Sequence, residues 1–145
     1  MAATTKPRKT REVSMKQFRR VLANGAIAQE GGLACIDTAT GALRAGGVAT
    51  TLKPVGIFID IGETAVTGDG TTTFVKVRLF KEVIAFWFVN DTGTAVTDAK
   101  FASPVYVLDD QTVTGASAGA SIAGRCWGVD ATKGVLVEPA INAGL

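Results

Sequence analysis

The sequence predicts a mainly β protein whose single-domain body is a β-sandwich or is β-barrel-like, of jelly-roll or β-tulip type. Clusters of Gly, Asp and Thr recur about every ten residues between short apolar stretches, a pattern typical of short strands joined by turns. Glycine is frequent, with 17 of 145 residues, and apolar residues make up 47 % of the chain against 19 % charged residues. A chain of this length and composition can bury one core and does not read as disordered.

The amino-terminal residues differ from the rest of the chain in charge. Residues 1–20 carry seven basic side chains and one acidic side chain, Glu12, for a net charge of +6, whereas the remaining eight basic and twelve acidic residues sum to −4. We therefore divide the chain into a basic arm at 1–25 and a β-rich body at 26–145, and we expect the arm to contact something outside its own domain. The arm residues assigned to this contact are Lys6, Arg8, Lys9, Arg11, Lys16, Phe18, Arg19 and Arg20.

The end of the arm predicts one short helix. Ser14 and Gln17 are spaced as in a capping box, and apolar residues follow at positions i, i+3 and i+4 from Phe18. Asn24 and Gly25 then signal a stop, so we expect a helix over about 14–23. The alternative is an extended arm that becomes ordered only against a partner.

From Ile27 onward the chain alternates between predicted strands and turns. Residues 109–111 are expected to form a tight turn, and so are residues 130–134, where Gly134 can adopt a positive φ. Residues 115–124 are almost wholly Gly, Ala and Ser, which predicts a loop or, alternatively, backbone packed closely against a neighbour. No internal repeat of 20–50 residues is evident. Strands are expected near 33–37, 55–61, 73–80, 83–89, 104–108, 112–114, 122–130 and 134–138.

The predicted strand at 83–89 contains the aromatic triplet Phe86, Trp87 and Phe88. Alternate residues of a strand point to opposite faces, so Phe86 and Phe88 share one face and Trp87 takes the other. If the Phe face is core, Trp87 lies at the surface and suits a subunit contact. A core on both faces, beneath a second sheet, is the equally weighted alternative.

Composition also excludes most familiar enzyme chemistry. The chain contains no histidine, so Ser-His-Asp and Cys-His nucleophiles and His-ligated zinc are excluded. Cys35 and Cys126 form no CxxC pair and are expected as buried free thiols. Residues 128–134 have Gly and Lys in the wrong order for a phosphate-binding loop, and the acidic residues at 68–70 and 109–110 are interpreted as turn residues. We therefore expect no enzyme activity, no cofactor and no metal site.

The sequence shows no secretory signal, because its start is polar and charged. The longest strictly apolar run, Val83 to Val89, is far short of the roughly 20 residues that span a bilayer. We therefore expect a soluble protein that is made in the cytoplasm.

Three targets fit the basic arm: nucleic acid, an anionic membrane, or an acidic patch on a protein assembly. A solubilising tail with no target is the fourth interpretation. Stacking on single-stranded nucleic acid is less favoured because Phe18 is the arm's only aromatic residue. The acidic body also argues against nucleic acid, so protein contact is the preferred interpretation.

Several phrases of the body resemble the head decoration proteins of tailed bacteriophages, also called capsid cement proteins. The likeness covers about residues 31–138 and depends on the order of short strand-and-turn phrases. The arm before residue 25 is not covered by it. The phrases are Asp37-Thr38-Ala39-Thr40-Gly41, Pro54-Val55-Gly56-Ile57, Val105 to Val113, Ala123 to Asp130 and Gly134 to Glu138.

This resemblance implies a small β-rich virion protein that binds the outer surface of a phage head. Such proteins form homo-dimers or homo-trimers at symmetry axes, contact the major capsid protein, and bridge neighbouring capsomers against the pressure of packaged DNA. The family offers no catalytic residues to carry over. The alternatives are a small nucleic-acid-binding protein that uses the basic arm, and a β-module of the phage tail or baseplate.

Overall fold

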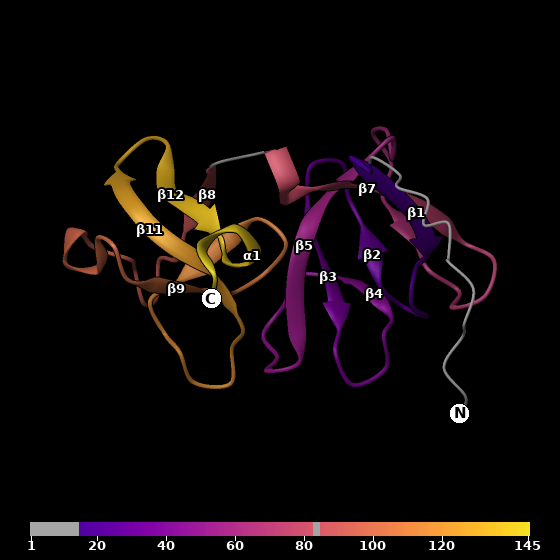
Figure 1. Ribbon diagram of the computed structural model, residues 1–145, viewed down its shortest axis with the longest axis horizontal. Coiled ribbons are helices and arrows are strands. Elements are labelled where there is room, and N and C mark those ends of the chain that lie inside the picture. The colour runs from indigo at the N-terminus through magenta and orange to yellow at the C-terminus, as the bar shows by residue number, and fades with distance from the viewer. Residues whose placement is uncertain (1–14, 83–84) are drawn as a thin grey trace, which may run out of the picture.

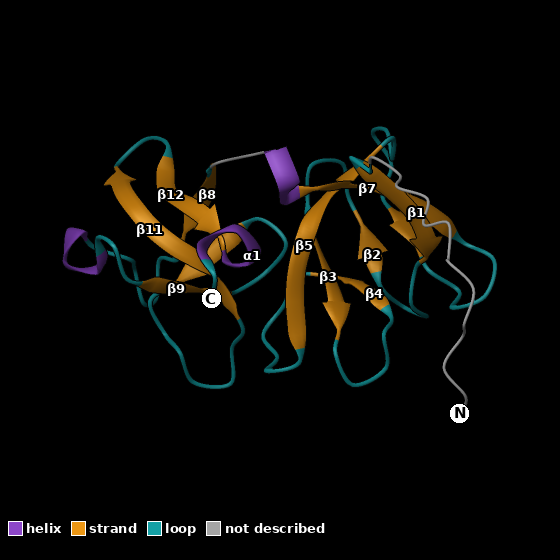
Figure 2. Cartoon of the chain, viewed as in Figure 1, coloured by secondary structure: helices purple, strands orange, loops and turns teal. Residues whose placement is uncertain are grey.

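The computed structural model describes residues 15–82 and 85–145, which form two lobes side by side (Figure 1). We call residues 15–82 the N-lobe and residues 85–145 the C-lobe. Strands make up 46 % of the structure and helices 7 %, which confirms the predicted fold class, mainly β and barrel-like. The helical segments, purple in Figure 2, are η1 (Phe80–Glu82), η2 (Asp98–Lys100) and α1 (Ala140–Ala143).

The N-lobe is a five-stranded antiparallel sheet with the order β1-β7-β5-β3-β4, accompanied by the short antiparallel pair β2 and β6. The first strand of the chain, β1, therefore lies at one edge of the sheet. The bounds are β1 (Gln17–Val21), β2 (Ile27–Ala28), β3 (Leu33–Asp37), β4 (Leu43–Ala45), β5 (Leu52–Ile59), β6 (Val66–Thr67) and β7 (Phe74–Leu79).

The C-lobe is a closed five-stranded barrel with the cyclic order β8-β12-β11-β9-β10. Its neighbours are antiparallel, except for β10 and β8, which run parallel and close the barrel. The bounds are β8 (Phe86–Asn90), β9 (Pro104–Val107), β10 (Thr112–Thr114), β11 (Ile122–Asp130) and β12 (Gly134–Pro139).

The two lobes share one strand topology. Taken in chain order, β1, β3, β4, β5 and β7 have the same neighbours as β8, β9, β10, β11 and β12. The parallel junction that closes the C-lobe, where Asn90 pairs with Val113, corresponds in the N-lobe to a single parallel bridge between Leu22 and Leu43. The fold is therefore duplicated within one chain.

Individual hydrogen bonds confirm this equivalence. The Gly31 N–H donates to the Phe58 carbonyl (2.9 Å), as the Ala102 N–H donates to the Cys126 carbonyl (2.7 Å). Gly31 and Ala102 both have positive φ, at 76° and 64°. The offset from Gly31 to Ala102 is 71 positions and from Leu22 to Asn90 is 68, a spacing longer than the 20–50 residues over which the sequence shows no repeat.

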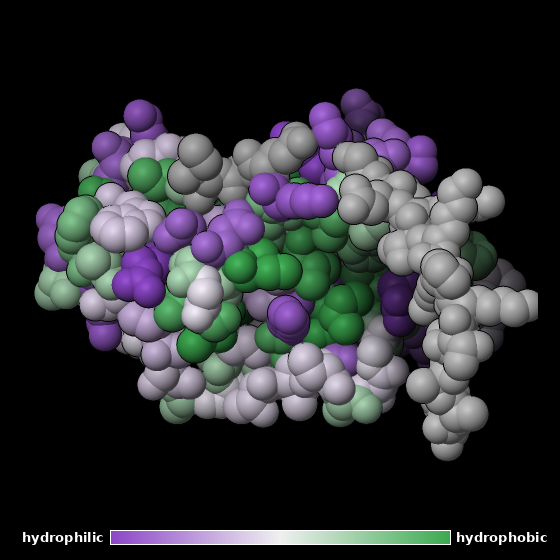
Figure 3. All heavy atoms as spheres, in the orientation of Figure 1, coloured by the Kyte–Doolittle hydropathy of each residue, from purple (hydrophilic) through white to green (hydrophobic). Residues whose placement is uncertain are grey.

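One buried cluster joins the lobes into a common core. It contains Leu33, Cys35 and Leu52 of the N-lobe together with the inward-facing residues of the barrel, such as Val107 and Cys126. Both cysteines are free and buried, as predicted. A second cluster around Phe58, Val77 and Leu22 fills the N-lobe alone. In Figure 3, apolar side chains gather between the lobes, over β5 and beside α1.

Most of the predicted strands agree with the structure, but the helix expected over 14–23 is wrong. Residues 33–37, 112–114 and 122–130 match β3, β10 and β11. The part of the helix prediction that the structure describes contains β1 instead, because residues 17–21 pair with β7, some 57 positions away. Ser14 of the predicted capping box lies outside the described residues. The one described α-helix, α1, lies near the carboxyl end of the chain.

The predicted turns are confirmed. Asp109 accepts hydrogen bonds from the Gln111 and Thr112 N–H groups between β9 and β10 (both 2.8 Å), and Gly134 has φ of 98°. The small-residue stretch at 115–124 combines both interpretations. Residues 115–121 are outside strands, whereas Gly124 lies within β11, where a Cβ atom would be only 1.9 Å from the Glu138 carbonyl oxygen.

Candidate functional site

The described basic residues of the arm lie on β1, at the edge of the N-lobe. The Arg20 guanidinium donates to the Gly41 carbonyl (2.7 Å), and the Arg19 guanidinium lies 4.9 Å from the centroid of the Phe74 ring. Phe18 packs against the N-lobe core. Lys16 precedes β1, and the four more amino-terminal cations of the predicted contact, Lys6, Arg8, Lys9 and Arg11, lie outside the described residues.

The fold extends this basic edge with cations from another strand. Arg19 pairs in register with Lys76 of β7, and Gln17 pairs with Arg78, so these side chains share one face. The Lys76 ammonium forms an ion pair with Asp60 (3.3 Å). Within the strand predicted near 73–80, Lys76 and Arg78 alternate with apolar residues, which predicts one available face, but the meeting of β1 with β7 depends on the tertiary fold.

Among the described residues, no strand pairs with the outer backbone edge of β1 at Gln17 and Arg19, whereas at the end of β1 Leu22 bridges Leu43 of β4. The Leu79 N–H donates to the Lys16 carbonyl (3.0 Å) and the Leu22 N–H donates to the Thr73 carbonyl (2.8 Å). Since hydrogen bonding alternates along an antiparallel pair, the even-numbered residues of β1 bond to β7, and the N–H and C=O groups of Gln17 and Arg19 point away from it. An edge of this kind is a template for contact with another chain.

A shallow hollow of about 430 Å³ lies where β1 meets the turn between β3 and β4. Arg20 ties the two walls together through its bond to Gly41. The lining residues are Arg19, Arg20, Val21, Ala23, Thr40, Gly41, Ala42, Gly70 and Phe74.

The structure decides between the two interpretations of the aromatic triplet. Phe86 and Phe88 pack against the shared core, whereas Trp87 is 45 % exposed, with the Lys133 ammonium 5.5 Å from its ring centroid. Trp87 and Val89 line a cleft of about 340 Å³ between the lobes. Across that cleft, burial and then the charge of Asp109 raise the pKa of Asp110. Trp87 thus lies at the surface, as the first interpretation predicts.

A second aromatic surface was missed by sequence reasoning. Phe101 is 58 % exposed and Trp127 is 40 % exposed, and their rings meet edge to face with centroids 5.4 Å apart. Trp127 sits at a register shift between β11 and β12, and its indole N–H donates to the Glu138 carboxylate (3.2 Å). A bulge of this kind turns a side chain outward, and no local sequence pattern marks it.

Asp69 and Asp109, two of the carboxylates interpreted as turn residues, serve as turn caps, whereas Asp110 lines the cleft between the lobes. Asp69 accepts hydrogen bonds from the Thr72 hydroxyl and from backbone N–H groups of residues 71–73, which hold its pKa well below the ordinary value. Backbone and Thr114 hydroxyl donors lower the pKa of Asp91, and backbone donors lower that of Asp130. In the described part of the chain, no group of three or more His, Cys, Asp or Glu residues could hold a metal ion.

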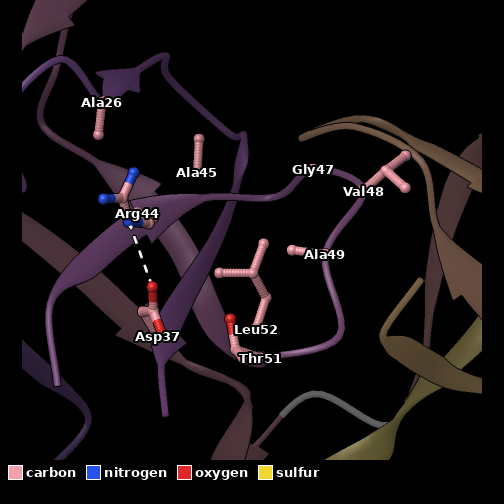
Figure 4. Close-up of a pocket in the computed structure, with 9 residues that line it drawn as sticks. All are labelled: Ala26, Asp37, Arg44, Ala45, Gly47, Val48, Ala49, Thr51 and Leu52. Carbon is pink, nitrogen blue, oxygen red and sulfur yellow. Dashed lines mark ion pairs between the residues drawn. The ribbon is translucent and has the colours of Figure 1, made fainter. Parts of the chain in front are cut away.

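A further hollow, of about 300 Å³, opens beside the β3–β4 hairpin (Figure 4). Arg44 forms an ion pair with Asp37 across it, at 3.6 Å. Asp37 also accepts a hydrogen bond from the Ala39 N–H (3.0 Å). Among the described residues that line this hollow, the only two charged side chains, Asp37 and Arg44, pair with each other.

No protein-family model matches the chain, and neither a curated protein nor a solved structure is significantly similar to it. Among the described residues, no helix has the length and apolar character needed to cross a membrane. The candidate contact surfaces of the described chain are the basic edge at β1 and the Phe101–Trp127 surface.

Proposed function

We propose that this chain is a structural virion protein that binds the outside of a phage head and cements neighbouring capsomers. The major capsid protein is the proposed partner, and the basic residues of the first 20 positions are the proposed contact. The proposal includes self-association at a symmetry axis, and no catalytic role. Many copies with modest contacts would together resist opening of the head.

The edge position of β1 is the observation that carries this proposal. It places the side chain of Arg19 and the backbone N–H and C=O groups of Gln17 and Arg19 at the margin of the described sheet. Cations combined with a strand edge that, among the described residues, has no partner strand at Gln17 and Arg19 suit recognition of a protein surface by ionic and backbone contacts. The resemblance of residues 31–138 to cement proteins supports the choice of a phage head as that surface.

The basic edge formed by β1 and β7 also favours a second candidate function. Arg19, Lys76 and Arg78 share a face, and Phe74, beneath Arg19, is 50 % exposed. Cations next to an exposed ring can bind single-stranded nucleic acid by charge and stacking. This candidate predicts binding to an oligonucleotide that weakens steeply as salt rises.

The test is quantitative mass spectrometry of purified phage particles, followed by labelling to locate the chain. Hundreds of copies on the head exterior, in simple ratio to the major capsid protein, are expected. A few copies at the tail would favour the baseplate alternative. Absence from particles together with salt-sensitive oligonucleotide binding would favour the nucleic-acid candidate.

The arm is tested by adding the chain back to undecorated heads. A variant that lacks residues 1–14 should remain folded but bind heads more weakly and protect them less against heat. The deletion must stop there because β1 begins at Gln17 and completes the sheet. Lys100→Gln, a neutralised cation far from β1, serves as the control and should bind like the unaltered chain. Unchanged binding by the truncated variant would contradict the arm assignment.

A further inference from the structure

We infer that copies of this chain join head to tail. The surface formed by β1 and the β3–β4 turn of one copy docks onto the Phe101–Trp127 surface of the next copy, as the C-lobe docks onto the N-lobe within one chain. The inference rests on the proposed function for its setting on a particle, and its evidence is the internal duplication of the fold.

The contact inside one chain supplies the template. From the C-lobe come β8 and the turn at 109–111, and from the N-lobe come residues 30–33 and Ile57. The Leu33 N–H donates to the Asp110 carbonyl (2.7 Å). The C-lobe thus contributes its first strand, β8, and the turn at 109–111, which we call the presenting surface. The N-lobe contributes residues 30–33 and Ile57, which we call the receiving surface.

The N-lobe has an equivalent of the presenting surface, formed by β1 and the turn between β3 and β4. Phe18 pairs with Val77 as Phe86 pairs with Val137, so Arg19 of β1 stands where Trp87 stands in β8. The turn between β3 and β4 corresponds to the turn at 109–111. Together they line the hollow of about 430 Å³ described above.

The C-lobe has its own copy of the receiving surface. Residues 101–104 correspond to residues 30–33, because the matched hydrogen bonds place Ala102 where Gly31 lies. Arg125, which pairs with Glu138, corresponds to Ile57, which pairs with Arg78. This surface carries the exposed Phe101 and Trp127.

The two surfaces are complementary in chemistry. The presenting surface carries Arg19 and Arg20, and the receiving surface carries two aromatic rings in edge-to-face contact, with Glu138 beside Trp127. Arginine over an aromatic face is a favourable pairing. The N-lobe holds eight basic and six acidic residues (+2), whereas the C-lobe holds three and six (−3).

Two details make the contact between copies weaker than the one within a chain. Pro104 stands where Leu33 stands, and it has no N–H to donate to the incoming turn. Arg125 is of the same sign as the incoming arginines, although its guanidinium is turned to the Ala102 carbonyl (3.2 Å). The expected contact is reversible.

The geometry requires a head-to-tail arrangement. The two surfaces lie at opposite ends of the molecule, with β1 at the right of Figure 2 and η2, which precedes Phe101, at the left. A contact between two different surfaces gives a closed ring, or a filament if the ring does not close.

The test is the mass of the full chain in solution, measured by light scattering and sedimentation over a range of concentrations. Phe101→Ser should disrupt the receiving surface, and Arg19→Glu should disrupt the presenting surface. Each substitution should weaken association by about fivefold or more. Ile27→Ser, an exposed apolar residue on neither surface, and Lys53→Glu, an exposed cation on β5, are the matched controls. Circular dichroism checks that every variant is folded.

The decisive measurement is a mixture of the Phe101→Ser and Arg19→Glu variants. Phe101→Ser keeps its presenting surface and Arg19→Glu keeps its receiving surface, so a 1:1 mixture should form heterodimers that grow no further. The inference would be overturned if the unaltered chain stayed monomeric or if the two variants associated like the controls. It would also be overturned if the mixture formed no heterodimer.

Failure of this inference is distinguishable from failure of the proposed function, because the measurement needs no phage heads. A chain that stays monomeric in solution but still decorates heads would refute the head-to-tail contact and leave the proposed head binding intact. A chain that associates as described but binds no heads would refute only the proposed function.

Discussion

The backbone N–H of Leu33 donates a 2.7 Å hydrogen bond to the carbonyl of Asp110, joining a strand of the N-lobe to a turn of the C-lobe. Ser121 provides a second connection of this kind. Its hydroxyl donates to the Ala49 carbonyl and accepts from the Leu52 N–H (3.2 Å). The lobes are thus coupled by specific polar contacts as well as by the shared apolar core.

Ser121→Ala should lower the free energy of unfolding by about 1–3 kcal/mol. Ser121 is buried, and its removal leaves the Leu52 N–H and the Ala49 carbonyl without their shared partner. The measurement is urea-induced unfolding followed by circular dichroism. Ser117→Ala, at an exposed position of the same loop, is the control and should change little. Equal stability of the two variants would show that this contact contributes nothing.

Gly124→Ala should destabilise the C-lobe by about 3 kcal/mol or more. The added Cβ atom would lie 1.9 Å from the Glu138 carbonyl oxygen, so the backbones of β11 and β12 would have to separate. Gly128 lies in the same strand, and a Cβ atom there meets nothing within 4 Å. Gly128→Ala should therefore be tolerated. Thermal unfolding of the two variants compares their stabilities. Equal stability would show that β11 and β12 separate at no cost.

Stability should fall in acid. The Gly93 N–H, the Thr114 hydroxyl and the Thr94 N–H all donate to Asp91 and lower its pKa in the folded state. A lowered folded pKa means stability that is fully present above the unfolded value of about 3.9 and is lost as pH falls through the folded value. Denaturant unfolding from pH 6 to pH 2 should therefore show a decline below about pH 4.

Asp91→Asn should make that decline shallower. The amide cannot titrate, so the variant loses the part of the pH dependence that belongs to Asp91. Curves for the variant and the unaltered chain that run parallel from pH 6 to pH 2 would contradict the role of this cap.

The two thiols should be unreactive in the folded chain. Burial raises the pKa of Cys35 to about 12, and Cys126 is likewise fully buried. Since the thiolate is the nucleophile, a disulfide reagent at pH 8 should modify neither cysteine until the chain unfolds. Two equivalents should then react in denaturant. Rapid reaction of one thiol under native conditions would show that the core opens locally.

The same pKa shift has a consequence in alkali. A folded pKa raised from 9.0 to about 12 gives stability that is present below pH 9 and is lost as pH rises toward 12. Cys35→Ala should remove this part of the alkaline destabilisation, at the cost of a small cavity in the core. The comparison is denaturant unfolding at pH 8 and pH 10.5.

Local patterns were enough to predict much of the fold. The strand at 33–37 and the turns capped by Asp109 and ended by Gly134 follow from alternation and from turn residues that act within a few positions. The exposed position of Trp87 was one of two interpretations of its strand, and the number of covering layers, a tertiary property, decided between them.

Interactions between distant residues decided the rest. Residues 17–21 have spacing that suits a helix, yet they form a strand because β7 offers backbone partners and a face for Phe18. The edge-to-face contact between Phe101 and Trp127 joins positions 26 apart through a bulge that no local pattern reveals.

By itself, the sequence determined that this is a β protein without histidine chemistry and with a basic amino-terminal region. The tertiary structure alone showed that Arg19 and Trp87 occupy equivalent places in two copies of one fold. Equivalent backbone positions need only equivalent hydrogen bonds, so the two lobes keep one topology while their exposed side chains differ in charge and in aromatic character.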